Sequence, residues 1–299
     1  MTHKGSPTVL GAELALLGVL ALLWGSSYLF IKIAVAEIPP VTLIAVRVTI
    51  AAAFLLAVMH WRGERLPRDA KTWRMLLLQS FLNSIGAWTI LAWGQQYVDS
   101  ALASVLNSTS PIFVFFITFA VTRHETVNPL RLFGACLGAL GVLLIVGVDA
   151  LESIGAQVAG QLAALAGAML YACAAVYGRN FSHLPAAVTA TGAMIWASAC
   201  LVPASLVLDR PWTLAPSGGA ILATLALSLL STGLALLIYF RLIRTLGSMG
   251  VASQAYLRAG VGVVLGMVFL GEHITPVIGL GLAAAIIGVA AINFPRPKT

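Results

Sequence analysis

The sequence has little charge. Only 9% of its 299 residues are Asp, Glu, Lys or Arg, whereas 60% are hydrophobic. A water-soluble domain carries about a quarter charged residues, so this composition excludes most soluble folds. Long segments that are apolar on every face must lie against lipid or against other spanning helices. The composition therefore predicts an all-α integral membrane protein.

Sequence motifs for catalysis, for metal binding and for ATP binding are also lacking. The three cysteines, Cys136, Cys173 and Cys200, lie in apolar runs and predict no disulfide. No His-Glu-x-x-His motif or Cys pair is spaced for a metal ion, and no Gly-x4-Gly-Lys-Ser/Thr loop is present for ATP. No nucleophile has a base at helical spacing. We therefore expect no metal, no cofactor and no enzymatic activity.

Carboxylates are missing from the middle of the apolar segments. All ten Asp and Glu residues and all five His residues fall at segment ends or in loops, with Glu13 in the first turn of its segment. A proton-coupled carrier usually keeps such a group within the membrane. The sequence thus predicts a facilitative carrier, or coupling that uses no buried acid.

Ten segments have the roughly 20 apolar residues that cross a bilayer as a helix. The first segment has no small-residue cleavage site, so we expect a retained span and not a signal peptide. The expected spans lie near residues 10–34, 41–60, 74–95, 98–121, 130–148, 157–180, 184–208, 217–240, 248–270 and 275–294.

Basic residues fall mainly on one side of these spans. Of seventeen Lys and Arg residues, thirteen lie near the chain ends and in alternate connections, whereas the opposite connections hold Arg210 alone. Positive connections stay in the cytoplasm, which predicts cytoplasmic N- and C-termini in a multi-pass protein of the bacterial inner membrane. The net charge of +7 therefore requires no nucleic-acid partner. The thirteen are Lys4, Arg62, Arg65, Arg68, Lys71, Arg74, Arg123, Arg131, Arg179, Arg241, Arg244, Arg296 and Lys298.

The two halves of the chain share a pattern of small residues and prolines. Each half, 10–148 and 157–294, holds five expected spans. Because five is odd, the second half must run in the opposite orientation, as an inverted-topology repeat, and such repeats exchange access around a site near the midplane. Alternating access is therefore predicted. A shift of 147 residues pairs Ser84 with Ser231, Gly86 with Gly233, Pro129 with Pro276, Gly134 with Gly281, Gly141 with Gly288, Trp24 with Tyr171, and Lys32 with Arg179.

Short motifs add to this pattern. The first span carries Leu-Trp-Gly-Ser-Ser-Tyr at 23–28 followed by Lys32, Arg47 lies in the second span, and the ninth span ends in Leu-Gly-Glu at 270–272. With ten spans in two halves, the chain from about 10 to 294 resembles the drug/metabolite transporter superfamily, EamA type. The resemblance implies export of small metabolites by a monomer with a central cavity, as in YddG-like exporters of aromatic and neutral amino acids. The family usually has a Pro in the ninth span, where residues 253–260 contain none.

Polar residues in the middle of two spans predict the solute site. Such residues cost free energy in lipid unless they pair or line water. The fourth span holds Asn107, Ser108 and Pro111. Because Pro111 cannot donate a backbone hydrogen bond, we expect a break near Asn107 that serves as a hinge. The aligned part of the ninth span contributes Gln254 and Tyr256.

Arg258 is the sharpest single candidate. It lies roughly 16 Å from the cytoplasmic start of the ninth span, which is too deep to reach the surface easily. We expect it to meet a substrate carboxylate. The alternative is that it donates to backbone carbonyls or polar neighbours and holds the bundle together.

Other spans supply further candidates. Aromatic faces with a few polar groups suit an amphipathic solute, although each aromatic side chain also fits the core or an interface belt. Lys32 can extend to the outer surface, Arg47 lies about 10 Å below it as a packing or gate residue, and Gly260 is a candidate hinge. The candidate binding residues of these spans are Trp24, Tyr28, Asn83, Trp88, Tyr171 and Tyr239.

Three functions compete. Export of amino acids or similar metabolites is the first, and export of other lipophilic or cationic compounds is the second, although a buried Arg258 without a buried acid would repel a cation. An intramembrane enzyme or a receptor is remote, because no catalytic pair lies at mid-span and no connection is long enough for a soluble domain. The expected partners are the lipid bilayer and a small-molecule substrate.

Two pairs of glycines have GxxxG spacing, Gly134 with Gly138 and Gly262 with Gly266. Such pairs allow helix backbones to approach closely, either between two copies of a chain or within one. We expect close packing inside a monomer.

Overall fold

The computed structural model describes residues 7–110, 112–114, 116–117, 130, 132–134, 136–138, 140–141, 144, 156–181, 183–239, 241–242, 245, 254–273 and 275–293. Within these ranges every regular element is a helix, which agrees with the all-α prediction. The helices of the first half are α1 (Pro7–Val35), α2 (Pro40–Trp61), α3 (Ala70–Ser80), the π-helical turn η1 (Phe81–Ala87), α4 (Trp88–Gly94) and α5 (Ser100–Asn107).

The helices of the second half follow a similar order. They are α8 (Ala156–Tyr177), the 3-10 turn η2 (Gly178–Phe181), α9 (Ala186–Leu208), the 3-10 turn η3 (Pro211–Thr213), α10 (Gly218–Ser228), the π-helical turn η4 (Leu229–Leu234), α12 (Gln254–Leu270) and α13 (Pro276–Asn293).

Six helices in the described ranges are long and apolar enough to cross a membrane. They cover Gly11–Val35, Pro40–Trp61, Ala70–Gly94, Gln157–Phe181, Ala187–Leu208 and Gly218–Tyr239. Shorter apolar helices lie in the expected ninth and tenth spans. Parts of the expected fourth and fifth spans lie outside the described residues, so the total of ten helices stays a prediction.

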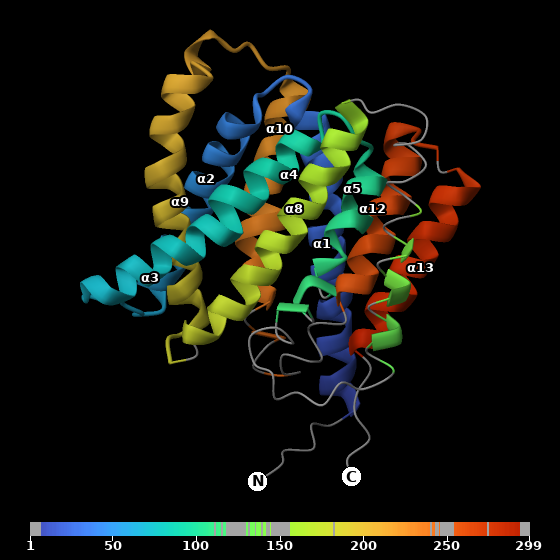
Figure 1. Cartoon of the computed structure of the whole chain (residues 1–299). Helices are drawn as coiled ribbons and strands as arrows, with labels where there is room; N and C mark the ends of the chain where they lie inside the picture. The colour runs from blue at the N-terminus through green and yellow to red at the C-terminus, as the bar shows by residue number, and fades with distance from the viewer. Residues whose placement is uncertain are drawn as a thin grey trace.

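The helices form one bundle in which the two halves of the chain pack side by side. Helix α2 packs on α9, α1 on α12, and α4 on α8. The start of α1 and the link between α2 and α3 lie at the same end of the bundle, and the link between α9 and α10 lies at the opposite end (Figure 1). These three contacts therefore join helices that are more than 60 residues apart in sequence.

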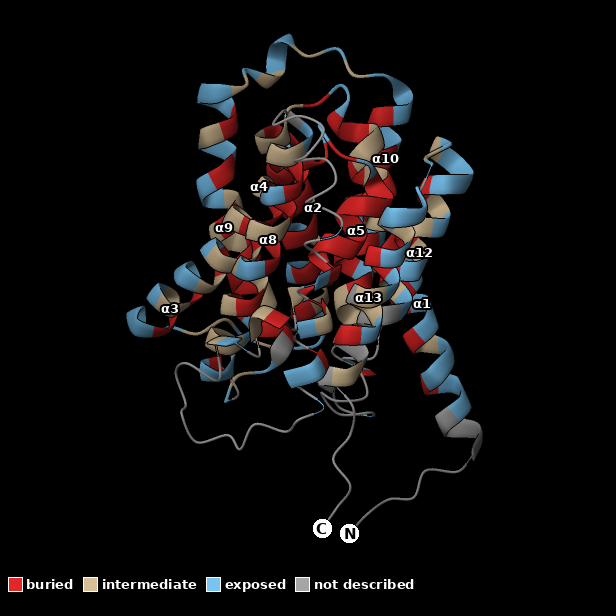
Figure 2. Cartoon of the chain, turned by 45° about the vertical axis from the view of Figure 1, so that its right-hand side comes forward, coloured by how far each residue is buried: buried red, intermediate tan, exposed pale blue. Residues whose placement is uncertain are grey.

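Burial follows the expectation for a protein whose outer surface meets lipid. Buried residues gather on α2, α5 and α10 in the centre, and exposed residues cover the outer sides of α9 and α13 (Figure 2). Large apolar side chains are exposed on α9, α10 and α12, including Val207 at 75%, Leu222 at 69% and Val268 at 69%. A water-soluble monomer rarely exposes so much apolar surface.

Glycines allow close contacts inside the chain. A Cβ atom at Gly288 would lie 2.5 Å from the carbonyl oxygen of Gly134 and 2.7 Å from the Cα of Gly138. A Cβ at Gly262 would overlap Ser104. Gly138 and Gly262, one from each GxxxG pair, therefore make close contacts within the chain, and the monomeric state stays a prediction.

Two π-helical turns occupy corresponding positions in the two halves. Ser84 lies in η1 and Ser231 in η4, and these two serines are related by the shift of 147 residues. A π turn inserts one extra residue and changes the direction in which the following side chains point. Both turns lead into the candidate site described below.

Carboxylates from one half bind helix N-termini of the other half. Glu37, which follows α1, accepts hydrogen bonds from the backbone N–H of Ser217 at 2.6 Å and from its Oγ at 2.7 Å, at the start of α10. Asp209, which follows α9, accepts from the backbone N–H of Thr42 at 2.8 Å and from its Oγ1 at 2.7 Å, in the first turn of α2. Each carboxylate satisfies otherwise unpaired N–H groups at a positive helix end.

Glu272 makes a third contact of this kind. It follows α12, and its carboxylate accepts from the backbone N–H groups of Ser100 at 2.7 Å and Ala101 at 2.9 Å, at the start of α5. The neighbouring carboxyl of Asp99 has a raised pKa because burial and the negative charge of Glu272 disfavour its ionised form. The three capping acids Glu37, Asp209 and Glu272 therefore link the two halves at one end of the bundle.

We predict that Gly288→Ala destabilises the protein by about 1–3 kcal/mol, because the new methyl group meets backbone atoms that cannot turn aside. The measurement is the thermal unfolding midpoint in detergent. Gly18→Ala in α1 is the matched control, because a Cβ at Gly18 has no atom within 4 Å. An equal midpoint for both variants would contradict the packing described.

Glu37 should make stability depend on pH. Its hydrogen bonds from the Ser217 backbone N–H and hydroxyl lower the pKa of the Glu37 carboxyl. Its stabilising contribution is therefore complete above the unfolded pKa of about 4.3 and is lost as pH falls through the lower folded pKa.

Thermal unfolding in detergent tests this pH dependence. Glu37→Gln should unfold at a lower temperature than the wild type at pH 7, and the difference should disappear as the pH falls below about 4. A difference that stays constant with pH would show that the charge of Glu37 is not involved.

Candidate functional site

Helix α5 ends in the middle of the expected fourth span, at Asn107. The predicted break is confirmed at this residue. Ser108 Oγ donates to the Ser104 carbonyl at 2.8 Å, and Thr109 Oγ1 donates to the Leu106 carbonyl at 2.6 Å. These hydroxyls satisfy carbonyl groups at a helix end that lies at membrane depth. Pro111, the predicted hinge, lies outside the described residues.

Asn107 joins the first and fourth expected spans. Its Nδ2 donates to the Tyr28 hydroxyl at 2.7 Å, and both residues are almost completely buried, at 1% and 2% exposure. In the described part of the chain its Oδ1 is buried without a hydrogen-bond partner. A buried acceptor without a donor is costly, so this oxygen is available to a donor group of a solute.

Arg47 lies between the two π turns. Its Nε donates to Oγ1 of Thr232 at 2.9 Å, and its guanidinium carbon lies 3.8 Å from the ring centroid of Trp88. Thr232 belongs to η4, and Trp88 directly follows η1. Arg47 is 5% exposed, so the two halves of the chain together enclose a positive charge.

Tyr171 brings a second arginine to this region. The Tyr171 hydroxyl lies near the Trp88 side chain and near the charges of Arg47 and Arg258. The Nε of Arg258 is buried and has no hydrogen-bond partner among the described residues. The structure thus gathers Arg47, Trp88, Tyr171 and Arg258 from α2, α4, α8 and α12.

Trp24 and Tyr239 form a separate aromatic pair. Their ring centroids lie 5.2 Å apart at an angle of 46°. They pack beside the small buried cluster that includes Leu20 and Leu242. Asn83 is half-buried in η1, where its Nδ2 donates to Ser84 Oγ at 3.4 Å.

Lys32 binds the protein backbone. Its Nζ donates to the carbonyls of Gln95 at 3.0 Å and Val98 at 2.6 Å, just past the end of α4. Gln95 is completely buried and donates from Nε2 to the Tyr28 carbonyl at 2.9 Å. The sequence did not single out Gln95, because the residues around a glutamine at the end of a span do not show whether its side chain is buried. Together Lys32 and Gln95 fasten α1 to the end of α4.

For three predicted residues of the ninth expected span, the structure describes no side-chain contact. Gln254 and Tyr256 lie in α12, but their side chains are outside the described part of the structure. Gly260 lies within the same continuous helix, and a Cβ there would have no atom within 4 Å.

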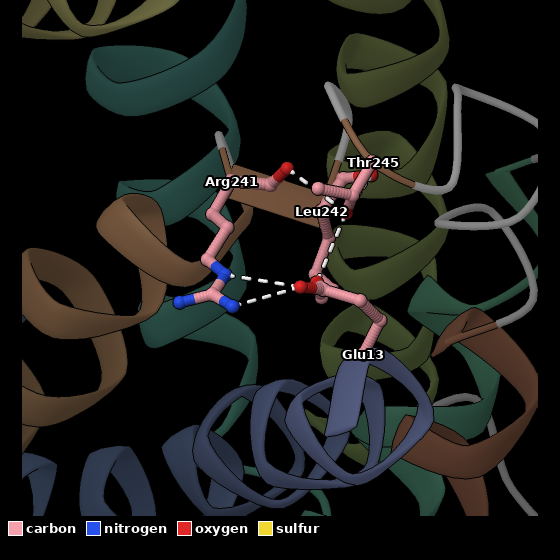
Figure 3. Close-up of polar contacts among 4 residues, drawn as sticks. All are labelled: Glu13, Arg241, Leu242 and Thr245. Atoms are coloured by element: carbon pink, nitrogen blue, oxygen red, sulfur yellow. Dashed lines mark hydrogen bonds and ion pairs between the residues drawn. The ribbon is translucent and has the colours of Figure 1, made fainter. Parts of the chain in front are cut away.

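Glu13 makes an ion pair that the sequence did not reveal. Its Oε1 lies 2.8 Å from Nη2 of Arg241 and 3.2 Å from its Nε, and its Oε2 accepts from Thr245 Oγ1 at 3.0 Å (Figure 3). Glu13 is 3% exposed although it lies in an early turn of α1. The sequence feature that could have indicated this ion pair is a single acid in an apolar segment together with a basic residue at the same expected membrane surface.

The residues that the structure describes contain no cluster of three or more His, Cys, Asp or Glu side chains that could hold a metal ion. The site offers guanidinium groups, amides, hydroxyls and aromatic rings. Such groups bind and orient a small organic molecule, and they provide no nucleophile paired with a base.

Comparisons with known proteins agree with this description. The EamA-like transporter family matches twice, over residues 11–147 and 158–294. "Uncharacterized inner membrane transporter YedA" of Escherichia coli K12 is 27% identical over 278 residues, with 93% of this chain and 89% of YedA covered. "Uncharacterized transporter YoaV" of Bacillus subtilis is 25% identical over 282 residues, with 93% and 96% covered.

A relative whose name states a substrate is more distant. The "probable terminal-alkyne amino-acid exporter" of Streptantibioticus cattleyicolor is 25% identical over 273 residues, with 90% of this chain and 89% of the exporter covered. A solved crystal structure has the same fold, with a TM-score of 0.65 at 21% identity over 94% of this chain and 97% of that chain. By its double family match and its apolar helices, this multi-pass membrane protein belongs to the EamA-like transporter family.

Proposed function

We propose that this transporter exports small organic metabolites, and amino acids in the first place, across the bacterial inner membrane. In this proposal both termini are cytoplasmic, the two halves are inverted five-helix units, and the solute passes between them by alternating access. The chain acts as a monomer and does no covalent chemistry on the solute.

The buried Nε of Arg258, which has no hydrogen-bond partner among the described residues, carries the proposal. A charge at this depth is retained when it pairs with another group or meets a ligand. The sequence places no Asp or Glu in the middle of any expected span, so no protein carboxylate is available there. A solute carboxylate would complete the missing pair, through strong charge-assisted hydrogen bonds.

The neighbouring groups suit the rest of an amino acid. The buried Oδ1 of Asn107 can accept a hydrogen bond from an ammonium group. The rings of Trp88 and Tyr171 offer apolar faces to a side chain. The exporter from Streptantibioticus cattleyicolor is named for an amino-acid solute, and the YedA relative is named for the inner membrane.

Contacts at both ends of the bundle are consistent with alternating access. The capping acids Glu37, Asp209 and Glu272 link the halves at one end. The pair Glu13 and Arg241 links them at the other end. In this proposal the contacts at the two ends open and close in turn, with movement near Pro111 and Gly260. The solute is then exposed first to one side of the membrane and then to the other.

Export of cationic or lipophilic compounds is the second candidate. Two guanidinium groups near Tyr171 repel a cation, and this repulsion is strong where the dielectric constant is low. An uncharged lipophilic compound would leave both guanidinium groups without a partner. An amino acid therefore fits the site better.

Arg258→Ala should lower transport of carboxylate-bearing solutes at least about tenfold, which corresponds to the loss of one charge-assisted hydrogen bond. The measurement is counterflow in proteoliposomes against labelled amino acids. Arg179→Gln is the matched control, because Arg179 is exposed at the end of a span. Unchanged transport by folded Arg258→Ala would show that Arg258 only holds the bundle together.

We also predict that an imposed pH gradient will not drive solute accumulation in proteoliposomes that contain only this protein. The reason is that no expected span carries a carboxylate or a His near its middle. Equilibration without accumulation is the expected result. Concentrative uptake driven by the gradient would refute the facilitative mechanism and direct attention to Glu13, the buried acid at a span end.

A further inference from the structure

We propose that Arg47 forms a second carboxylate subsite, so that the preferred solutes carry two acidic groups, as dicarboxylic amino acids do. This inference rests on the proposed function, because it names the class of solute that the same site selects. It depends on the donors that Arg47 leaves unused.

Arg47 has unused donors in a fixed position. A guanidinium group carries five N–H donors. Nε donates to Thr232, and Trp88 stacks on the guanidinium group. In the part of the chain that the structure describes, neither terminal NH2 group of Arg47 makes a hydrogen bond or an ion pair. Four N–H donors thus remain unused on a residue that is only 5% exposed, and a ligand that reaches them can accept hydrogen bonds from them.

Two other cations of this chain show what a purely structural contact looks like. Lys32 donates to two backbone carbonyls, and Arg241 donates to the carboxylate of Glu13. In both cases the charged end of the side chain meets a protein acceptor. Arg47 is more deeply buried than Arg241, yet its terminal nitrogens meet none among the described residues.

The geometry of Arg47 also suits a carboxylate in particular. The two terminal NH2 groups of a planar guanidinium match the two oxygens of a carboxylate. Stacking on Trp88 and the hydrogen bond to Thr232 fix the plane before a solute arrives. A donor group that is already fixed loses little conformational entropy on binding, so the subsite is preorganised.

Two arginines at one site point to two acidic groups. Arg47 and Arg258 both lie near the Tyr171 hydroxyl, and the sequence places no acid in the middle of any expected span. A solute with a single carboxylate neutralises one of these charges and leaves the other buried. A solute with two carboxylates neutralises both, which strongly favours it where the dielectric constant is low.

Glutamate and glutamine provide a matched test on the wild-type protein. They have nearly the same shape, and only the side-chain carboxylate distinguishes them. We expect glutamate to compete in proteoliposome counterflow at a concentration at least about tenfold lower than glutamine, the ratio for one charge-assisted hydrogen bond. Equal competition by both, or stronger competition by glutamine, would overturn the second subsite.

Variants assign the effect to Arg47. Arg47→Gln should remove the preference by weakening glutamate alone, whereas Arg258→Gln should weaken both amino acids, because each keeps its α-carboxylate. Arg179→Gln should leave both unchanged, because Arg179 is exposed. A glutamate preference that survives in folded Arg47→Gln would overturn the role of Arg47. If Arg47→Gln does not fold, the wild-type comparison still decides between one subsite and two.

The failure of this inference is distinct from the failure of the proposed function. Exchange of glutamine and other monocarboxylates without preference for glutamate would leave amino-acid export standing and remove the second subsite. No exchange of any carboxylate-bearing solute would remove both.

Discussion

A charge or an unpaired backbone group inside a bilayer must find a partner, and this constraint organises the whole molecule. The ends of the bundle satisfy it with protein groups: the acids Glu37, Asp209 and Glu272 meet exposed helix N-termini. The middle satisfies it only in part, since Arg47 is buried and the Nε of Arg258 is buried, and neither pairs with a carboxylate among the described residues. This unmet requirement in the middle is the basis of the proposed affinity for an anionic group.

The repeat explains why this site lies where it does. A π turn in each half places one contact of Arg47, since Trp88 directly follows η1 in the first half and Thr232 lies within η4 in the second. Neither half alone contains the complete set of contacts. A site built at the junction of two similar units can be exposed from either side without being rebuilt, because each unit keeps its own contribution while the two units move relative to one another.

Sequence reasoning predicted the features that depend on local composition. The apolar segments, the helix end at Asn107 and the paired positions of Ser84 and Ser231 all follow from spacing and from proline or small residues. The partners of Glu13 and of Lys32 could not be predicted, because they depend on which helices lie side by side and at what height. The residues next to Glu13 or Lys32 in the sequence do not show which helix packs against them. The family resemblance supplied the fold, but not these contacts.

The long-range caps have a consequence for how the protein is made. A chain enters the membrane from its N-terminus as it is synthesised. The acid that caps α2 is residue 209, and the acid that caps α5 is residue 272, so both helices are inserted well before their caps exist. The first half must therefore wait in the bilayer with unsatisfied helix ends, exposed to the insertion machinery and to water at the surface. Insertion of the last helices then supplies the missing caps. The two halves must therefore fold together, although their sequences are two separate repeats.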